Sequence, residues 1–339
     1  MKYFLSIIAL AAFAFSASVG SKAQQAQTLA SPGTPVARFE YRAFASQTLT
    51  DQEFLIGKKD NSSISLAAEL RFPSGVPANQ KLPAIVLLEG SGGLGSSDAA
   101  MDSWKADLNK LGIVTVAIDS FTNRGIFNTM ADQTQLGRLN MIIDAWRALE
   151  FLSKDPRIDV TRVAVMGFSR GGQAALYAAE RRFQQLHGPA GLEFAAYVAE
   201  YPWCGTAFHD DTNLSDKPIF VATGDQDNYT VGQVKCKEFL ARVPQQGRSI
   251  SFVIYAGAQH YFDSPATPVA VRDNAITNRN CRMGEGENGQ ILNLETKNLY
   301  SEKTDTCVEK GPTAGWNETA NAKLRADVTA FLKKALKLN

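Results

Sequence analysis

The stretch Val163-Ala-Val-Met-Gly-Phe-Ser-Arg-Gly-Gly172 decides how this chain is interpreted. It opens with an apolar, strand-like run, passes through Gly-x-Ser-x-Gly and continues into a helical pattern. That order predicts a nucleophile elbow, a tight strand-to-helix turn that exposes a serine. The residues two before and two after the serine must be small, and Gly167 and Gly171 meet this requirement. Ser169 is the candidate nucleophile, and the alternative is a glycine-rich turn with a surface serine.

Apolar runs and amphipathic segments alternate on both sides of this turn. Such alternation predicts an α/β fold, with a mostly parallel central sheet and helices on both faces. Two earlier strand-like runs, 39–50 and 64–72, are separated by a polar turn and predict an antiparallel edge. The expected core strands are 84–88, 114–119, 162–166, 195–201, 219–223 and 250–255, and the expected helices are 100–111, 133–153, 170–182, 231–243 and 321–336.

The first 23 residues are typical of a signal peptide. Lys2 precedes an apolar run over residues 3–17, and Ser21-Lys-Ala23 offers small residues for cleavage after Ala23. The run is shorter than the roughly 20 residues of a membrane span, although an uncleaved anchor is the alternative. Cleavage would leave residues 24–339 as a single domain, exported to the periplasm or secreted, with no membrane association after the signal is removed.

The composition gives no sign of a nucleic-acid or membrane-surface partner. The chain has 339 residues, with 35 Lys and Arg against 34 Asp and Glu, and it contains no basic block. A balanced charge gives no reason to expect a nucleic-acid partner. The oligomeric state is left open by the sequence.

Four cysteines follow the signal-like segment, and an even count in an exported protein favours disulfides. We expect Cys204–Cys236, which would join two neighbouring strand regions, and Cys281–Cys307. The second bond would staple residues 264–318, a polar segment with little periodicity that is expected to form a lid or pocket wall. Four buried free thiols are the alternative.

A serine nucleophile needs a base and a group that orients the base. Only three histidines are present, and His260 follows the last strand-like run, where the carboxyl edge of the sheet should lie. His187 and His209 are predicted to lie in loops away from that edge. Asp227 is the favoured orienting acid because it falls three residues after the turn glycine Gly224, while Asp225 is the competing carboxylate.

An oxyanion hole would use backbone N–H groups from two places. One is Arg170, directly after the nucleophile, and the other is Ser91 or Gly92 in the glycine-rich loop after residues 84–88. The alternative is an ordinary glycine-rich turn.

Several segments together resemble the dienelactone hydrolase family of α/β hydrolases. They cover residues 60–265 and the last helix, with matches at 119–125, 155–159, 167–172, 201–204, 224–227 and 256–260. The order serine, acid, histidine is the α/β-hydrolase order. The chain departs from the family in two respects: the family proper uses a cysteine nucleophile where this chain has Ser169, and residues 264–318 are more elaborate. Serine resembles the esterase-like relatives.

The resemblance also draws attention to Glu89, because the family has a nearby glutamate implied in activating the nucleophile. Glu89 is therefore a candidate catalytic group, or alternatively a structural partner of Arg124 or Arg170. Arg124, Trp203 and Tyr261 are further candidate pocket residues. Arg124 could instead pair with a protein carboxylate, and Trp203 could belong to the core.

These observations favour a serine hydrolase that cleaves a small carboxylic ester through an acyl-enzyme, with Ser169, Asp227 and His260 as its triad. A peptidase or amidase could use the same three residues. A non-catalytic binding protein on a hydrolase scaffold is the hypothesis from another class. No cofactor and no metal is expected, and His209-Asp-Asp211 is not taken as a metal site.

Overall fold

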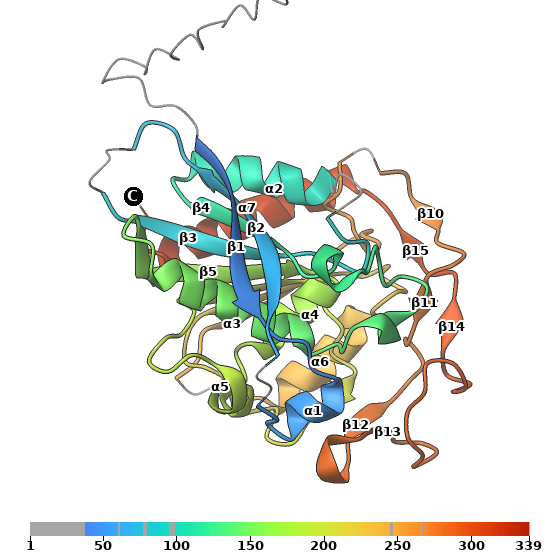
Figure 1. Ribbon diagram of the computed structural model, residues 1–339. Helices are drawn as coiled ribbons and strands as arrows, with labels where there is room; N and C mark the ends of the chain where they lie inside the picture. The colour runs from blue at the N-terminus through green and yellow to red at the C-terminus, as the bar shows by residue number, and fades with distance from the viewer. Residues whose placement is uncertain are drawn as a thin grey trace, which may run out of the picture. The chain divides into compact units, whose positions relative to one another are not determined.

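The centre of the protein is an eight-stranded sheet with the strand order β1-β2-β4-β3-β5-β6-β8-β9 (Figure 1). The computed structural model describes residues 38–59, 62–76, 80–94, 99–244, 247–265 and 267–338. The first two strands form an antiparallel edge, and the strands from β4 to β9 run parallel to one another, as the sequence predicts. The strands are β1 (Arg38–Ser46), β2 (Ile64–Phe72), β3 (Leu82–Leu88), β4 (Val114–Asp119), β5 (Ile158–Phe168), β6 (Ala196–Glu200), β8 (Ile219–Gly224) and β9 (Ile250–Tyr255).

Helices cover both faces of this sheet. The helices are α1 (Asp51–Leu55), α2 (Ala99–Lys110), α3 (Asn140–Ser153), α4 (Arg170–Tyr177), α5 (Arg181–His187), α6 (Gly232–Arg242) and α7 (Glu318–Ala335). Three short 3₁₀ turns lie at Thr122–Arg124, Gln133–Gln135 and Glu287–Gly289. None of the helices in the described part of the chain combines the length and hydropathy that a membrane crossing requires.

Strand β3 shows how the core divides between the two faces. Ala84, Val86 and Leu88 pack into the cluster formed with α3, α4 and α6, while Ile85 and Leu87 pack against α2 and α7. This is the period-two alternation of a strand whose two faces are both buried. All seven residues of β3 are buried, so the carboxyl end of this strand is a fixed platform for the loop that follows.

Residues 264–318 add small sheets of their own. Strand β10 (Ala270–Val271) pairs with β15 (Thr313–Ala314), and β11 (Ile276–Thr277) pairs with β14 (Glu309–Lys310). Strand β12 (Met283–Glu285) pairs with β13 (Ile291–Asn293) and with β7 (Thr206–Ala207), which follows β6. Figure 1 shows these short strands arranged one after another along one side of the sheet.

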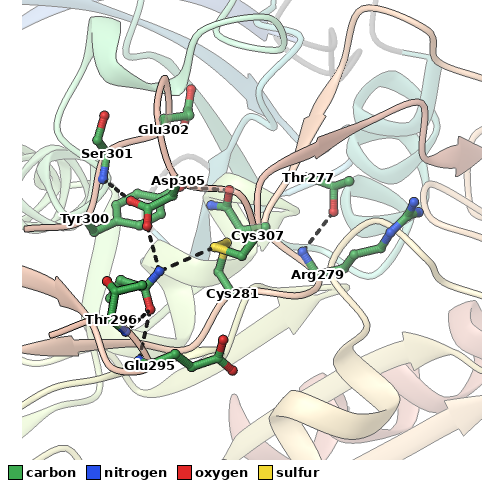
Figure 2. Close-up of a disulfide and its surroundings, with 12 residues drawn as sticks. Thr277, Arg279, Cys281, Glu295, Thr296, Tyr300, Ser301, Glu302, Asp305 and Cys307 are labelled. Atoms are coloured by element: carbon green, nitrogen blue, oxygen red, sulfur yellow. Dashed lines mark hydrogen bonds between the residues drawn. A yellow bond between two sulfur atoms is a disulfide. The ribbon is translucent and has the colours of Figure 1, made fainter. Parts of the chain in front are cut away.

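Both predicted disulfides are present, and no cysteine of the described chain is free. The Cys204–Cys236 bond joins the segment after β6 to α6, and Cys281–Cys307 joins two arms of the 264–318 segment. Figure 2 shows polar side chains around the second bond, including Asp305, which accepts a hydrogen bond of 2.5 Å from the Ser301 backbone N–H. The predicted signal peptide, residues 1–23, lies outside the described residues. Every described residue belongs to one unit that spans Pro35–Asn339.

Two helix boundaries differ from the sequence prediction. The helix expected over 133–153 begins only at Asn140, because residues 136–139 are held outside a helix by the guanidinium of Arg170 bonded to the carbonyls of Leu136 and Gly137. The helix expected over 170–182 breaks at Glu180, whose backbone is extended and forms a bridge with Leu214. In both places a tertiary contact overrides the helical pattern.

Candidate active site

The serine predicted as nucleophile lies in a strained turn between β5 and α4. Ser169 has φ 53° and ψ −110°, a backbone conformation that non-glycine residues rarely adopt. A Cβ on Gly167 would lie 2.0 Å from the Gly171 carbonyl oxygen, and one on Gly171 would lie 2.3 Å from that of Leu88. Glycine is therefore required at both positions, and the turn has the geometry of a nucleophile elbow.

His260 and Asp227 complete a hydrogen-bonded row that begins at this serine. The Ser169 Oγ lies 2.9 Å from His260 Nε2, and His260 Nδ1 lies 2.9 Å from Asp227 Oδ2. His260 comes from the loop after β9 and Asp227 from the loop after β8, while Ser169 follows β5, so all three side chains lie at the carboxyl edge of the sheet, with β6 between β5 and β8. Burial opposes ionisation of Asp227, but the nearby His260 and backbone hydrogen bonds from Thr230 and Tyr229 outweigh it and lower the pKa of Asp227.

The competing carboxylate and the other histidines lie elsewhere. Asp225 is exposed, and its Oδ1 accepts a hydrogen bond of 2.8 Å from the Gly257 N–H, which ties the loop after β8 to the loop after β9. His187 is buried beside Phe54, and its Nε2 lies 2.7 Å from the Phe54 carbonyl oxygen. His209 lies beside Glu285, with 3.5 Å between its Nδ1 and the Oε1 of Glu285. Of these alternatives, none contacts Ser169.

A pocket of about 320 Å³ opens onto Ser169 and His260. Tyr229 and Tyr201 pack on the two sides of the imidazole, with ring centroids 4.6 and 4.7 Å from it. The one guanidinium on the pocket wall belongs to Arg272, which donates only to the carbonyls of Pro268 and Ala314 among described residues. The wall consists of Gly90, Ser91, Gly92, Gly93, Met130, Phe168, Ser169, Tyr201, Tyr229, His260, Tyr261, Thr267, Arg272 and Ala314.

The segment 264–318 supplies part of this wall and is fastened to the histidine. His260 forms a parallel bridge with Ala314, and the Gly315 N–H donates to the His260 carbonyl over 2.9 Å. Thr267, Arg272 and Ala314 line the pocket. The segment therefore forms a wall of the pocket, in keeping with the sequence prediction.

The loop after β3 lies against the elbow. A Cβ on Gly90 would lie 3.6 Å from the Ser169 Cβ, and Ser91 and Gly92 both line the pocket. Arg170 begins α4, so its backbone N–H is one of those that a helix leaves unpaired at its first turn. The side chain of Arg170 is buried and bonds to other groups. Its guanidinium donates a hydrogen bond of 2.8 Å to Gln133 Oε1, and the Gln133 amide NH₂ donates one of 3.0 Å to Ser91 Oγ.

Glu89 lies behind this loop rather than in the pocket. Its side chain is fully buried, and its Oε1 accepts a hydrogen bond of 2.7 Å from the Ser120 N–H. The ion pair considered with Arg124 or Arg170 is not formed, because each arginine bonds to other groups. Burial and the neighbouring charge of Asp119 raise the pKa of Glu89 well above its usual range. Burial therefore favours the uncharged form of Glu89, whose contact with the Ser120 N–H supports the loop.

Changing Glu89 to Gln is expected to lower ester hydrolysis by less than about tenfold, or about 1.4 kcal/mol of barrier. A glutamine oxygen can accept the Ser120 N–H in the same way, and burial already favours the uncharged form of the glutamate. Steady-state kinetics of Glu89→Gln test this expectation. A loss of about 10²- to 10⁴-fold, as is typical when a general acid or base is removed, would instead give Glu89 a catalytic role.

The remaining predicted pocket residues have different outcomes. Arg124 was a candidate for the pocket, but it is buried in a bidentate pair with Asp144, with both N–O distances 2.8 Å. Trp203 is mainly a core residue that packs with Cys281 and Met283, and its indole donates 3.0 Å to Thr206 Oγ1. It also borders a small recess beside Ser169. Tyr261 does line the pocket.

A second buried acid lies below the site. Glu200 ends β6, and its backbone carbonyl accepts a hydrogen bond of 2.9 Å from the Ser169 N–H. Its carboxyl group is fully buried beside Asp263, whose two oxygens accept from Trp104 Nε1 and from the Tyr201 hydroxyl, each over 2.7 Å. Burial and the nearby charge of Asp263 raise the pKa of Glu200 well above its usual range. The folded protein therefore favours the protonated form of Glu200.

The Glu200→Gln variant should gain stability relative to the wild type as the pH rises. Above the ordinary pKa of a glutamate, the unfolded chain releases the Glu200 proton while the folded protein tends to keep it. The free energy of unfolding of the wild type therefore falls by up to about 1.4 kcal/mol for each pH unit above the ordinary pKa. Glutamine has no proton to release. Denaturant unfolding of both proteins from pH 4 to 8 measures the difference, and the exposed Glu238→Gln controls for removing one carboxyl group. If the free energies of unfolding of Glu200→Gln and the wild type change with pH in parallel, the pKa of Glu200 is not raised in the folded protein.

Sequence reasoning missed several residues of the pocket wall. Tyr201 and Tyr229 follow strand ends, as binding residues often do, but nothing in their spacing indicates that they flank His260. Met130, Thr267 and Arg272 reach the pocket from irregular segments. For these residues, the one sequence feature that could have indicated a pocket position is the basic side chain of Arg272, which lies in the segment after His260.

These features define the class of protein as an α/β hydrolase, with an elbow serine and a histidine–aspartate pair at the carboxyl edge of the sheet. The sequence model of the dienelactone hydrolase family matches residues 73–285, well over half of the chain. The protein belongs to this family and is a hydrolase.

Solved structures give the same fold. The dienelactone hydrolase-like promiscuous phosphotriesterase P91 from metagenomic libraries is 16% identical with a TM-score of 0.51, and m3DLH is 16% identical with a TM-score of 0.54. Each comparison covers 88% of this chain and 98% of the other. At this identity the likeness concerns the fold alone. No curated protein has significant sequence similarity to the chain.

Proposed function

We propose that this hydrolase is a serine esterase in which Ser169, His260 and Asp227 act as a catalytic triad. The observation that carries the proposal is the row of two 2.9 Å contacts that begins at the strained Ser169. The apolar pocket beside it suits the organic part of a small ester. A binding protein without catalysis would need neither a strained serine nor a buried carboxylate behind the histidine.

In the proposed mechanism His260 Nε2 accepts the hydroxyl proton while Ser169 Oγ attacks the ester carbonyl carbon. Asp227 accepts the Nδ1–H of His260 and stabilises the imidazolium that forms. The backbone N–H of Arg170, with that of Ser91 or Gly92, donates to the developing oxyanion. His260 then gives the proton to the departing alcohol oxygen, which leaves an acyl group on Ser169. Water, deprotonated by His260, releases the acid and restores the serine.

We also propose that residues 1–23 direct export and are removed after Ala23. The two disulfides support this location, because such bonds persist in oxidising compartments. Intact-mass measurement of the protein purified from cells tests the proposal. A mass starting at Gln24 is expected, and full-length protein retained in the cytoplasm would contradict export.

A comparison of matched ester and amide substrates tests the class of bond. We expect hydrolysis of 4-nitrophenyl acetate and butyrate, and much slower hydrolysis of the corresponding 4-nitroanilides. Ser169→Ala, purified identically, gives the background from any contaminating esterase. Faster cleavage of the anilides or of peptides would support a peptidase or amidase, and no Ser169-dependent turnover of either series would contradict the enzyme.

A further inference from the structure

A second hollow, larger than the pocket at Ser169, lies on the other side of the elbow. It has a volume of about 510 Å³ and lies between α1, the loop 133–139 and residues 289–303. We call it the side cavity. The proposed ester chemistry does not use it, although its volume is that of a site for a substantial ligand.

A narrow recess joins the side cavity to the nucleophile. The recess has a volume of about 30 Å³ and is bordered by Ser169. Gln133, Arg138 and Gln173 border both the recess and the side cavity. Because the recess also shares Ser91 and Tyr229 with the pocket, the two hollows flank the same serine. The side cavity therefore lies next to the recess at Ser169, and the side chains of Gln133, Arg138 and Gln173 stand between the two.

The floor of the side cavity is apolar and its rim is polar. Leu136 and Phe208 are buried in the floor, and the rim carries Gln52, Gln290 and Ser301. Amide and hydroxyl groups both donate and accept hydrogen bonds. Such a cavity matches a ligand that has an apolar face and several hydroxyl groups around its edge.

The charges around the side cavity are balanced. Arg138 Nη2 and Glu302 Oε2 form an ion pair of 2.7 Å, and Asp51 and Lys303 contribute one charge of each sign. The Asp51 carboxylate is also occupied, since it accepts a hydrogen bond of 2.9 Å from the Leu139 N–H. This arrangement offers no excess charge to attract an ionic ligand, so it favours a neutral one.

The wall of the side cavity is held in place before any ligand binds. Tyr300, Ser301 and Glu302 lie beside the Cys281–Cys307 disulfide (Figure 2). The Tyr300 hydroxyl donates a hydrogen bond of 2.9 Å to Asn278 Oδ1, and Glu302 Oε1 accepts one of 2.7 Å from the Gln133 N–H. A wall fixed in this way loses little conformational freedom on binding.

We propose that the side cavity binds a neutral sugar unit, so that the substrate is an ester of a carbohydrate hydroxyl with a short acyl group. A pyranose ring has an apolar C–H face for the floor and hydroxyl groups for the rim. This inference rests on the proposed esterase function. The reaction consumes one water and releases the free sugar hydroxyl and the acid, with Ser169 carrying the acyl group in between.

The test compares a monoacetylated methyl β-glucopyranoside with ethyl acetate and 4-nitrophenyl acetate. The wild type should hydrolyse the glycoside acetate with a kcat/KM at least about tenfold above that for ethyl acetate. Ser301→Trp, which fills the side cavity, should lower the ratio of kcat/KM for glycoside acetate over 4-nitrophenyl acetate by at least about tenfold. Gln290→Trp, on the exposed rim, is the second variant should Ser301→Trp fail to fold.

Thr304→Trp is the matched control, because Thr304 is exposed on the same segment outside the side cavity. It should leave the ratio unchanged. The sugar site would be wrong if the enzyme hydrolyses 4-nitrophenyl acetate but does not prefer the glycoside acetate over ethyl acetate. It would also be wrong if neither cavity-filling variant changes the ratio of kcat/KM for glycoside acetate over 4-nitrophenyl acetate. Either result would be compatible with the proposed esterase function. Failure to hydrolyse any of the three esters would instead count against the proposed function.

Discussion

Ser169→Ala is expected to lower kcat for ester hydrolysis by about 10⁴- to 10⁶-fold, as removal of the nucleophile does in triad hydrolases. The substitution removes only the Oγ that contacts His260 over 2.9 Å. The strained backbone at residue 169 is fixed by the glycines around it, and alanine retains the same Cβ, so the fold should persist. Kinetics on 4-nitrophenyl butyrate, together with circular dichroism and thermal unfolding, measure both expectations.

The outcome is informative in either direction. Whatever rate remains in Ser169→Ala reports binding and oxyanion stabilisation without covalent catalysis. A folded variant that retains activity within about tenfold of the wild type would show that another group is the nucleophile. The proposed mechanism would then be wrong, whereas the fold and the family membership of the protein would be unaffected.

Asp227→Asn is expected to lower kcat by about 10⁴-fold, the size of loss known when the triad acid becomes an amide. Asp227 Oδ2 accepts the Nδ1–H of His260, and this contact fixes the tautomer that leaves Nε2 free to take the serine proton. An asparagine can present its NH₂ to Nδ1 and so favour the wrong tautomer. The hydrogen bonds from Tyr229 N–H and Thr230 N–H go to Oδ1 and can be kept by the amide oxygen, whereas the Thr230 hydroxyl donates to Oδ2 over 2.9 Å and would have to turn toward the new NH₂.

Asp225→Asn is the matched control in the same loop. Asp225 is exposed and its carboxylate accepts a hydrogen bond from the Gly257 N–H, which an asparagine oxygen can also accept, so we expect a loss below about tenfold. The pH profile separates the two positions further, because the loss in Asp227→Asn should be least at high pH, where hydroxide can assist. Equal losses at the two positions, or a larger loss in Asp225→Asn, would contradict the assignment of the orienting acid.

The sequence predicts the parts of the fold that depend on local pattern. The apolar runs identify the six parallel strands of the central sheet, and the two strand-like runs before them identify the antiparallel edge. The order serine, acid, histidine places Ser169, Asp227 and His260 at the carboxyl edges of β5, β8 and β9. The pairing of four cysteines follows from the same topology, since Cys204 and Cys236 come from the segments after β6 and β8.

What the sequence misses depends on contacts between distant segments. Arg124 carries no sign in the sequence that it will pair with Asp144 rather than line the pocket. The loop 136–139 has a helical pattern, but contacts from the buried Arg170 side chain and from Asp51 hold it outside α3. The short strands and irregular stretches after His260 carry no periodic signal, yet they supply Thr267, Arg272 and Ala314 to the pocket wall and residues 289–303 to the side cavity.

Covalent trapping at Ser169 tests the central claim most directly. Wild-type protein treated with a fluorophosphonate should gain the mass of one phosphonyl group, and peptide mapping should place that group on Ser169. Ser169→Ala should gain nothing, and His260→Ala should react far more slowly because no base takes the serine proton. A wild-type protein that remains unmodified, or a label mapped to any residue other than Ser169, would contradict the account of this protein as a serine hydrolase.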